Sequence, residues 1–191
     1  MKRVERAELL DNAAYEAGRV VHRQRVIELK RARRVHLGDH MSLVFENRDT
    51  VLFQIQEMVR TEQITREAAI QHELDTYNEL IPDAHELSAT LFVEYEDTSE
   101  RDRMLTLLAG VEDKFALLVD GERVPVRNET RGTRSDRTTA VHYLKFPLGE
   151  RLAGLVRTLR APIALSVEHP HYRASSPLPV ATLKELALDL A

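Results

Sequence analysis

Apolar residues recur every three or four positions along the first part of the chain. No proline interrupts this run before residue 34, and the apolar stripe consists of Leu10, Ala13, Ala14, Ala17, Val20 and Val21. This is the spacing of one face of an α-helix. The pattern therefore predicts one long amphipathic helix over about residues 10–34.

Two later segments alternate apolar and polar residues. Residues 35–46 and 87–95 have the two-residue period of half-buried strands, and Gly38 is expected to bulge the first of them. Between these strands, Asn47 and Thr65 stand where helix N-caps are expected. We therefore predict a helical hairpin between the two strands.

The second half of the chain contains a clear hairpin pattern. Asp120-Gly121 lies between two short apolar alternations, which is typical of a two-residue β-turn. Pro162 and Pro170 flank an apolar strand and favour a short strand or an edge position for it. The remaining patterns predict a short helix opened by Ser99, strands over 140–146 and 163–167, and helices over 150–159 and 181–190.

These elements together predict an α+β fold. We expect a mixed, largely antiparallel sheet with a long N-terminal helix, a helical hairpin and further helices packed on it. The 43% apolar content is enough for one core. Because no internal repeat or long linker divides the chain, residues 1–191 are predicted to form a single domain.

Composition narrows the function classes. The chain has no cysteine, which excludes disulfides, thiol catalysis and cysteine-ligated zinc or iron–sulfur clusters held by this chain. The N-terminus lacks the apolar core of a signal peptide, and no apolar stretch approaches the length of a membrane span. We therefore expect a cytoplasmic protein without membrane insertion.

Charge is distributed unevenly along the chain. The net charge of −4 does not favour general nucleic-acid binding. Seven basic residues lie between Arg19 and Arg34 against the single acid Glu28, whereas eleven acids lie between Glu67 and Asp102. These segments are either solvated faces that attract one another, within the fold or across a homo-oligomer, or docking surfaces for a charged partner.

Several longer strings carry a family resemblance, of which F-E-N-R-D-T-V and Y-N-x-L-I-P are the most specific. The chain resembles the bacterial domain-of-unknown-function family numbered 3501, from the first helix to about residue 172. The matching segments are RRVHLGDHMSLVFENRDTVLFQIQEM (33–58), ELDTYNELIPDAHELSATLFVEY (73–95), TTAVHYLKF (138–146) and HPHY (169–172).

This resemblance implies no catalytic residues, because the family has no assigned activity. Similar proteins are often encoded near rubrerythrin-like and iron–sulfur oxidoreductase proteins. The resemblance therefore implies a redox or oxidative-stress setting, with proteins of those two kinds as partners.

Histidines and carboxylates form the first candidate site. By strand parity, His142 and His169 are expected to point toward apolar surroundings. With Glu46, Glu57 and Glu73 they could hold a divalent transition metal such as iron, manganese or zinc. The alternative is that each histidine is a hydrogen-bonded core residue and each glutamate a cap, an ion-pair partner or a surface residue.

An arginine-rich segment forms the second candidate site. Guanidinium groups suit phosphate and carboxylate, but no glycine-rich nucleotide-binding string accompanies them, so a solvated loop is the alternative. The arginines are Arg123, Arg127, Arg131, Arg134 and Arg137.

Three hypotheses of function follow, and they leave open whether the protein is an enzyme. The favoured one is a non-enzymatic accessory or binding protein in a redox or oxidative-stress context, with the basic first helix and the acidic central segment as contact surfaces. The alternative is a metal-binding protein or metal-dependent redox enzyme with the His/Glu site. The third is anion or nucleic-acid binding through the arginine-rich segments.

Overall fold

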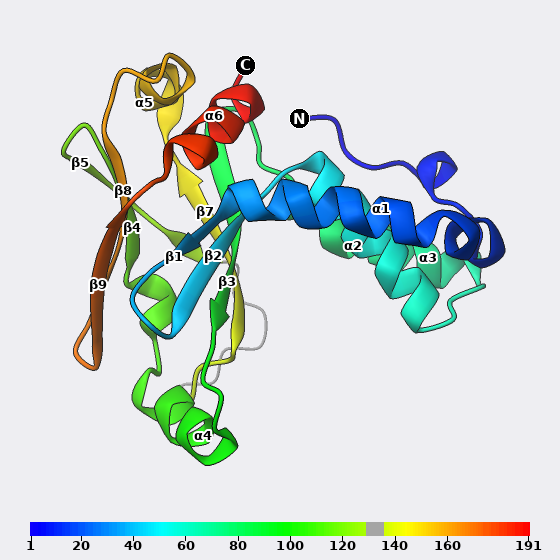
Figure 1. Cartoon of the computed structure of the whole chain (residues 1–191), viewed down its shortest axis with the longest axis horizontal. Helices are drawn as coiled ribbons and strands as arrows, with labels where there is room; N and C mark the ends of the chain where they lie inside the picture. Colours follow the sequence, from blue (N-terminus) through cyan, green and yellow to red (C-terminus); the bar gives the residue numbers. More distant parts are fainter. Residues whose placement is uncertain (129–135) are drawn as a thin grey trace.

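Two antiparallel sheets pack face to face and form a sandwich (Figure 1). The computed structural model describes residues 1–128 and 136–191. The first sheet has the order β1 (Arg34–His36), β2 (Met41–Glu46), β3 (Glu86–Val93), β7 (Val141–Pro147) and β6 (Arg127–Asn128). The second has the order β5 (Glu122–Pro125), β4 (Phe115–Val119), β8 (Ile163–His169) and β9 (Tyr172–Pro177). This confirms the predicted α+β fold, with the strands divided between two sheets.

A helical arm extends from the outer face of the first sheet (Figure 1). It consists of α1 (Asn12–Arg33), α2 (Arg48–Thr61) and α3 (Glu67–Asn78), with the short helix η1 (Arg6–Glu8) beside α3. The N-cap of α2 is Asn47, as predicted, whose side chain accepts a hydrogen bond from the Thr50 N–H. The long first helix and the helical hairpin are therefore both confirmed.

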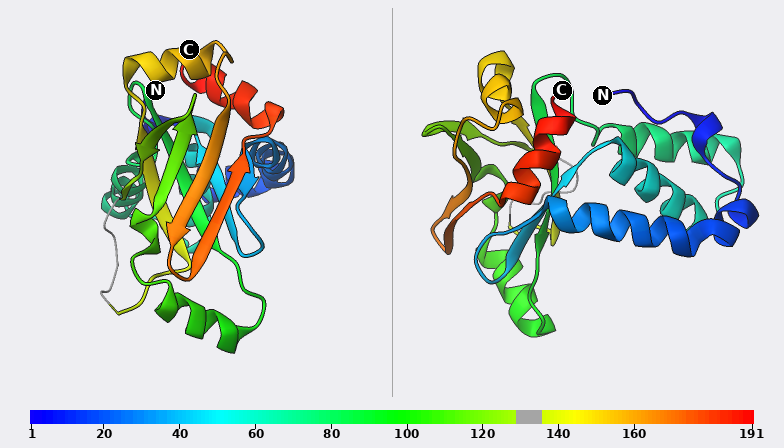
Figure 2. Two further views of the ribbon diagram at one scale, coloured as in Figure 1. Left: turned by 90° about the vertical axis from the view of Figure 1, so that its left-hand side faces the viewer. Right: turned by 45° about the horizontal axis from the view of Figure 1, so that its top comes forward.

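The remaining helices close the ends of the sandwich. In Figure 2, α5 (Gly149–Arg157) and α6 (Val180–Asp189) lie at one end, and α4 (Thr98–Leu107) lies at the other. Each of these three helices contributes a buried leucine to the inter-sheet core, namely Leu152 from α5, Leu186 from α6 and Leu105 from α4. A short turn of 3-10 helix, η2 (Val111–Asp113), leads from α4 into β4.

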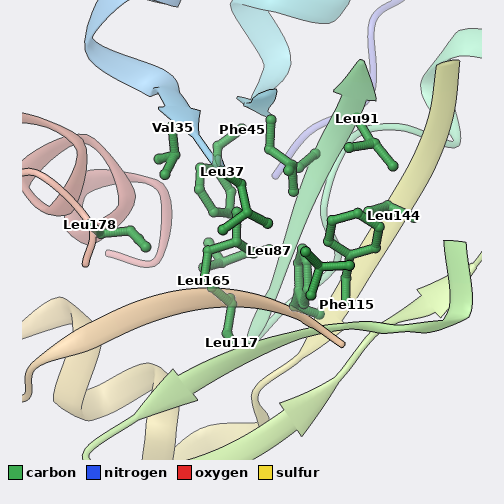
Figure 3. Close-up of a cluster of buried hydrophobic side chains, with 14 of the residues drawn as sticks. Val35, Leu37, Phe45, Leu87, Leu91, Phe115, Leu117, Leu144, Leu165 and Leu178 are labelled. Carbon is green, nitrogen blue, oxygen red and sulfur yellow. The ribbon is translucent and has the colours of Figure 1, made fainter. Parts of the chain in front are cut away.

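The core between the sheets is built by the two-residue alternation of the strands. Phe45, Leu91 and Leu144 from the first sheet meet Phe115 and Leu165 from the second, and each is 0% exposed (Figure 3). The opposite parity of the first sheet faces the arm. A second, smaller core inside the arm contains Val4, Val51, Ile55, Ile70 and Leu74.

Residues 35–46 form a hairpin and not the single bulged strand that the alternation suggests. β1 and β2 pair antiparallel, with His36 opposite Ser42. The chain turns at Gly38, which has a φ of +69°, a value that favours glycine. The Tyr172 hydroxyl holds this turn from β9, because it donates to the Leu37 carbonyl at 2.7 Å.

The edge position predicted for the strand between Pro162 and Pro170 is wrong. This strand, β8, lies between β4 and β9, since Pro170 stands in the turn of a hairpin that returns as β9. β9 was missed because its residues, YRASSP, include few large apolar side chains. At α4, Asp97 and not Ser99 is the N-cap, accepting from the Glu100 N–H at 2.7 Å.

Candidate functional site

Helix α1 carries its apolar stripe on the side that faces solvent. Of its 22 residues only Tyr15, Val26 and Arg33 are buried. Val20 and Val21, away from that buried side, are 81% and 75% exposed. We call Ala13, Ala17, Val20, Val21 and Ile27 the outward stripe, and all five are exposed. An amphipathic helix normally turns such a stripe toward the core, so the orientation of α1 needs a separate cause.

Polar contacts with α2 set the orientation of α1. The Tyr15 hydroxyl donates to the Glu57 carboxylate at 2.8 Å, and the Arg19 guanidinium donates to both of its oxygens at 2.8 and 2.9 Å. The hydrogen bond from Arg19 lowers the pKa of Glu57 to about 2, and the hydrogen bond from Tyr15 acts in the same direction. The polar side of α1 is thus the attached side.

Two grooves of opposite charge lie near the C-terminal end of α1. A basic groove of about 450 Å³ is lined by Ile27, Lys30, Arg31, Arg34 and His36. An acidic groove of about 520 Å³ is lined by Asp39, His40, Glu94, Tyr95, Glu96, Asp97 and Glu100. Arg34 and Glu94, 3.8 Å apart, join the two grooves. The basic and acidic segments of the sequence therefore meet on one face of the molecule.

A small apolar cavity lies where α1 meets α2. It has a volume of about 140 Å³, and its walls include Leu10, Val26, Leu29, Leu52 and Phe53. It adjoins α1 along the length that carries the outward stripe. In the part of the chain that the structure describes, no helix combines the length and apolar content of a membrane span.

The three predicted glutamate ligands lie on the arm side of the first sheet. Glu46, at the end of β2, is 7% exposed and accepts hydrogen bonds from Thr50 and Thr90, the latter at 2.6 Å. Glu57 is engaged by Arg19 and Tyr15, as described above. Glu73 is half-buried on α3.

The two predicted histidine ligands face the space between the sheets, His142 from β7 of the first sheet and His169 from the end of β8 in the second. His142 and His169 are 4% and 6% exposed, as their parity predicted. Burial lowers the pKa of both, and the charge of Glu112 opposes this shift in both. Both histidines therefore lie near Glu112, a residue that sequence patterns did not single out because only its burial distinguishes it.

A buried hydrogen-bond chain surrounds His142. Its Nε2 atom lies 2.8 Å from the Thr138 hydroxyl, which donates to Glu112 at 2.9 Å. The Nδ1 atom of His169 accepts from the His171 N–H at 3.2 Å, so its Nε2 atom carries the proton and faces the Ala109 carbonyl. Each histidine is satisfied by protein groups.

Strand parity separates the five predicted metal ligands. The three glutamates lie on the arm side of the first sheet, whereas His142 and His169 lie on the other side of it, between the two sheets, so the five residues do not converge. Among residues 1–128 and 136–191, no three His, Cys, Asp or Glu side chains gather in a way that could hold a metal ion. Tyr77 lines the space beneath the arm, and Tyr172 contacts the β1–β2 turn.

The arginine-rich segment is only partly described. Arg131 and Arg134 lie outside the described residues. Arg127 pairs with Glu86 and Arg137 with Asp102, in both cases at distances of 2.9 Å or less. Arg123 is exposed on β5. Two of the predicted anion-binding arginines thus already have acidic partners.

Comparison with known proteins finds relatives without an activity. A family model described as "Protein of unknown function (DUF3501)" matches residues 3–190. The crystal structure of a novel protein of unknown function from Burkholderia pseudomallei K96243, at 1.90 Å resolution, is similar over 100% of both chains, with 36% identity and a TM-score of 0.93. No curated protein matches the chain.

Proposed function

The chain belongs to the DUF3501 family, as its sequence strings predicted, and we propose that it is an accessory protein that binds another protein through α1. The observation that carries this proposal is the outward stripe. Two adjacent valines, 81% and 75% exposed, stand at the middle of a helix whose polar side is the attached one. Contiguous exposed apolar residues rimmed by charges are typical of protein contacts.

Burial of the stripe would supply much of the binding free energy. Covering Val20 and Val21 would contribute about 3 kcal/mol together, at about 25 cal/mol per Å² of apolar surface. An apolar centre with a charged rim is the composition of a specific interface.

The partner should present an acidic rim, because the flanks of the stripe are basic. Arg23, Arg25 and Arg31 are exposed on α1, and the basic groove continues from its end. The redox setting implied by the family resemblance indicates which partners to examine. These are an iron–sulfur oxidoreductase and a rubrerythrin-like protein, the two kinds of partner that the resemblance implies.

The test uses purified proteins and a pair of matched double variants. Val20→Glu with Val21→Glu places two charges on the outward stripe. Val180→Glu with Leu188→Glu does the same on α6, where these residues are 68% and 70% exposed. Titration calorimetry against each candidate partner should show about a hundredfold loss of affinity for the α1 variant only.

Two outcomes would contradict the proposal. One is that neither candidate partner binds the wild-type protein, or that both double variants bind as the wild type does. The other is that sedimentation velocity shows a wild-type dimer that the α1 variant loses. In that case a second copy of the chain, and not an accessory partner, covers the stripe.

The metal hypothesis is the alternative, and one observation favours part of it. His142 is linked to the buried Glu112 carboxylate through the Thr138 hydroxyl, at distances of 2.8 and 2.9 Å. This alternative predicts about one iron, manganese or zinc per chain in protein purified without chelators, with loss of the metal in His142→Ala and His169→Ala. Protein that stays metal-free after exposure to all three ions would contradict it.

A further inference from the structure

A cavity of about 250 Å³ lies on the outer face of the first sheet, beneath the helical arm. Its walls come from β2, β3 and β7 of the sheet and from all three helices of the arm. Several of these residues are polar although they lie between two structural layers. We call this space the Glu46 cavity, after the residue with the most buried charge in its wall.

The carboxylate of Glu46 has hydroxyl partners but no cationic one. Glu46 is 7% exposed, and its two oxygens accept hydrogen bonds from Thr50 and Thr90, which are 0% and 6% exposed. Among the residues that the structure describes, no lysine, arginine or histidine forms an ion pair with it. A buried carboxylate that lacks a counter-ion retains a large desolvation penalty.

The neighbouring buried glutamate on the same sheet face shows the contrast. Glu86 is 5% exposed, and its oxygens pair with Lys145 and Arg127, both at 2.9 Å. The fold thus supplies two cations to one buried carboxylate of this face and none to the other. The difference between Glu86 and Glu46 is that the cavity opens beside Glu46.

The walls beside Glu46 are aromatic and apolar. Phe92, Tyr143 and Tyr77 line the cavity together with Leu80 and Val51. Gln54 adds a side-chain amide to the same wall. Aromatic faces attract an ammonium group and also pack against a carbon skeleton.

The wall of the same cavity also includes a positive charge. Lys30, near the end of α1, lines both the Glu46 cavity and the basic groove. Its ammonium group lies 6.0 Å from the ring centre of Phe53. A ligand in this cavity therefore has both a negative charge, from Glu46, and a positive charge, from Lys30, within its walls.

We propose that the Glu46 cavity binds a small zwitterionic amine of amino-acid size, with its ammonium group on Glu46 and its carboxylate toward Lys30. The aromatic walls hold its side chain. This site is separate from the outward stripe, and the proposal does not depend on the binding partner of α1.

The first experiment separates the two charged ends of the ligand. Titration calorimetry on the wild-type protein would use leucine and phenylalanine, the amines isoamylamine and phenethylamine, and the acids 4-methylpentanoate and 3-phenylpropanoate. We expect at least one amino acid to bind, its amine to bind about tenfold more weakly, and its deamino acid not to bind. Lys30→Ala should weaken binding of the amino acid but not of the amine.

The second experiment compares two glutamate variants. Glu46→Gln should lower the affinity for the amino acid by about tenfold or more, because it removes the charge that pairs with the ammonium group. Glu86→Gln, on the same face, should bind as the wild type does. Val141→Trp, at a position 42% exposed in the cavity wall, should block binding without touching Glu46, which decides the matter if Glu46→Gln does not fold.

Three results would overturn the proposal. The first is that neither amino acid and neither amine binds at about 10 mM, well above the range of a specific site. The second is that the deamino acids bind as well as the amino acids. The third is that Glu46→Gln or Val141→Trp binds like the wild type.

Discussion

The sandwich and helix α1 of the arm use apolar residues in opposite ways. Between the sheets, large side chains such as Phe45, Phe115 and Phe146 are 0% exposed. On the attached side of α1, Tyr15 and Arg19 donate hydrogen bonds to the Glu57 carboxylate of α2. On the other side of the helix, Val20 and Val21 face solvent. The comparison teaches that burial of apolar area stabilises the sandwich, whereas polar contacts help to hold α1 and leave Val20 and Val21 available for binding.

The largest expected effect is in the sandwich. Phe115→Ala should lower the free energy of unfolding by about 4 kcal/mol, because a fully buried aromatic ring leaves a cavity that both sheets border. Urea denaturation followed by circular dichroism measures this loss. A loss below about 1 kcal/mol would mean that the inter-sheet core is not the main source of stability.

The next effect concerns the joint between the two regions. Arg33, at the end of α1, is 1% exposed and pairs with Asp189 of α6 at 2.6 Å. Arg33→Ala should lower the free energy of unfolding by about 3 kcal/mol, because it leaves Asp189 buried without a cation. Arg33→Met with Asp189→Leu should recover most of the loss in the same urea assay, and no recovery would contradict the ion-pair explanation.

A smaller effect, dependent on pH, tests the polar attachment of α1. The pKa of Glu57 falls from 4.5 to about 2 on folding, so the stability that it supplies is complete above pH 4.5 and is lost as pH falls toward 2. At pH 7, Glu57→Gln should lower the free energy of unfolding by about 2 kcal/mol. Urea titrations at several pH values should show this difference shrinking below pH 4.5, and a constant difference would contradict the assignment.

The smallest effect is expected on the outward stripe. Val20→Ala with Val21→Ala should change the free energy of unfolding by less than about 0.5 kcal/mol, because both side chains are already in solvent. Thermal unfolding of the isolated protein measures this. A loss above about 1 kcal/mol would show that the stripe is covered by the protein itself or by a second copy.

Local patterns predicted most elements because they act within a few residues. The Asp120-Gly121 turn, the Asn47 cap and the alternation in β3 and β7 are each decided by backbone geometry and side-chain parity. The parity of His142 was also predicted correctly. β9 was not predicted, because a polar edge strand has no apolar period to recognise.

The candidate sites depended on information that no local pattern contains. Glu46 was singled out from the sequence, but its partners Thr50 and Thr90 and the surrounding cavity come from α2 and β3. The expected convergence of Glu46 with His142 fails because the two residues lie on opposite faces of the first sheet. Glu112 carried no signal at all.

The sequence by itself determined the α+β class, the family and the long first helix, because periodicity and short strings are properties of the chain. The tertiary structure alone decided the division into two sheets and the direction in which α1 faces. It also decided that Glu86 receives cations whereas Glu46 faces a cavity. The physical reason is that burial and charge pairing arise between residues far apart in the chain, after the strands have been ordered.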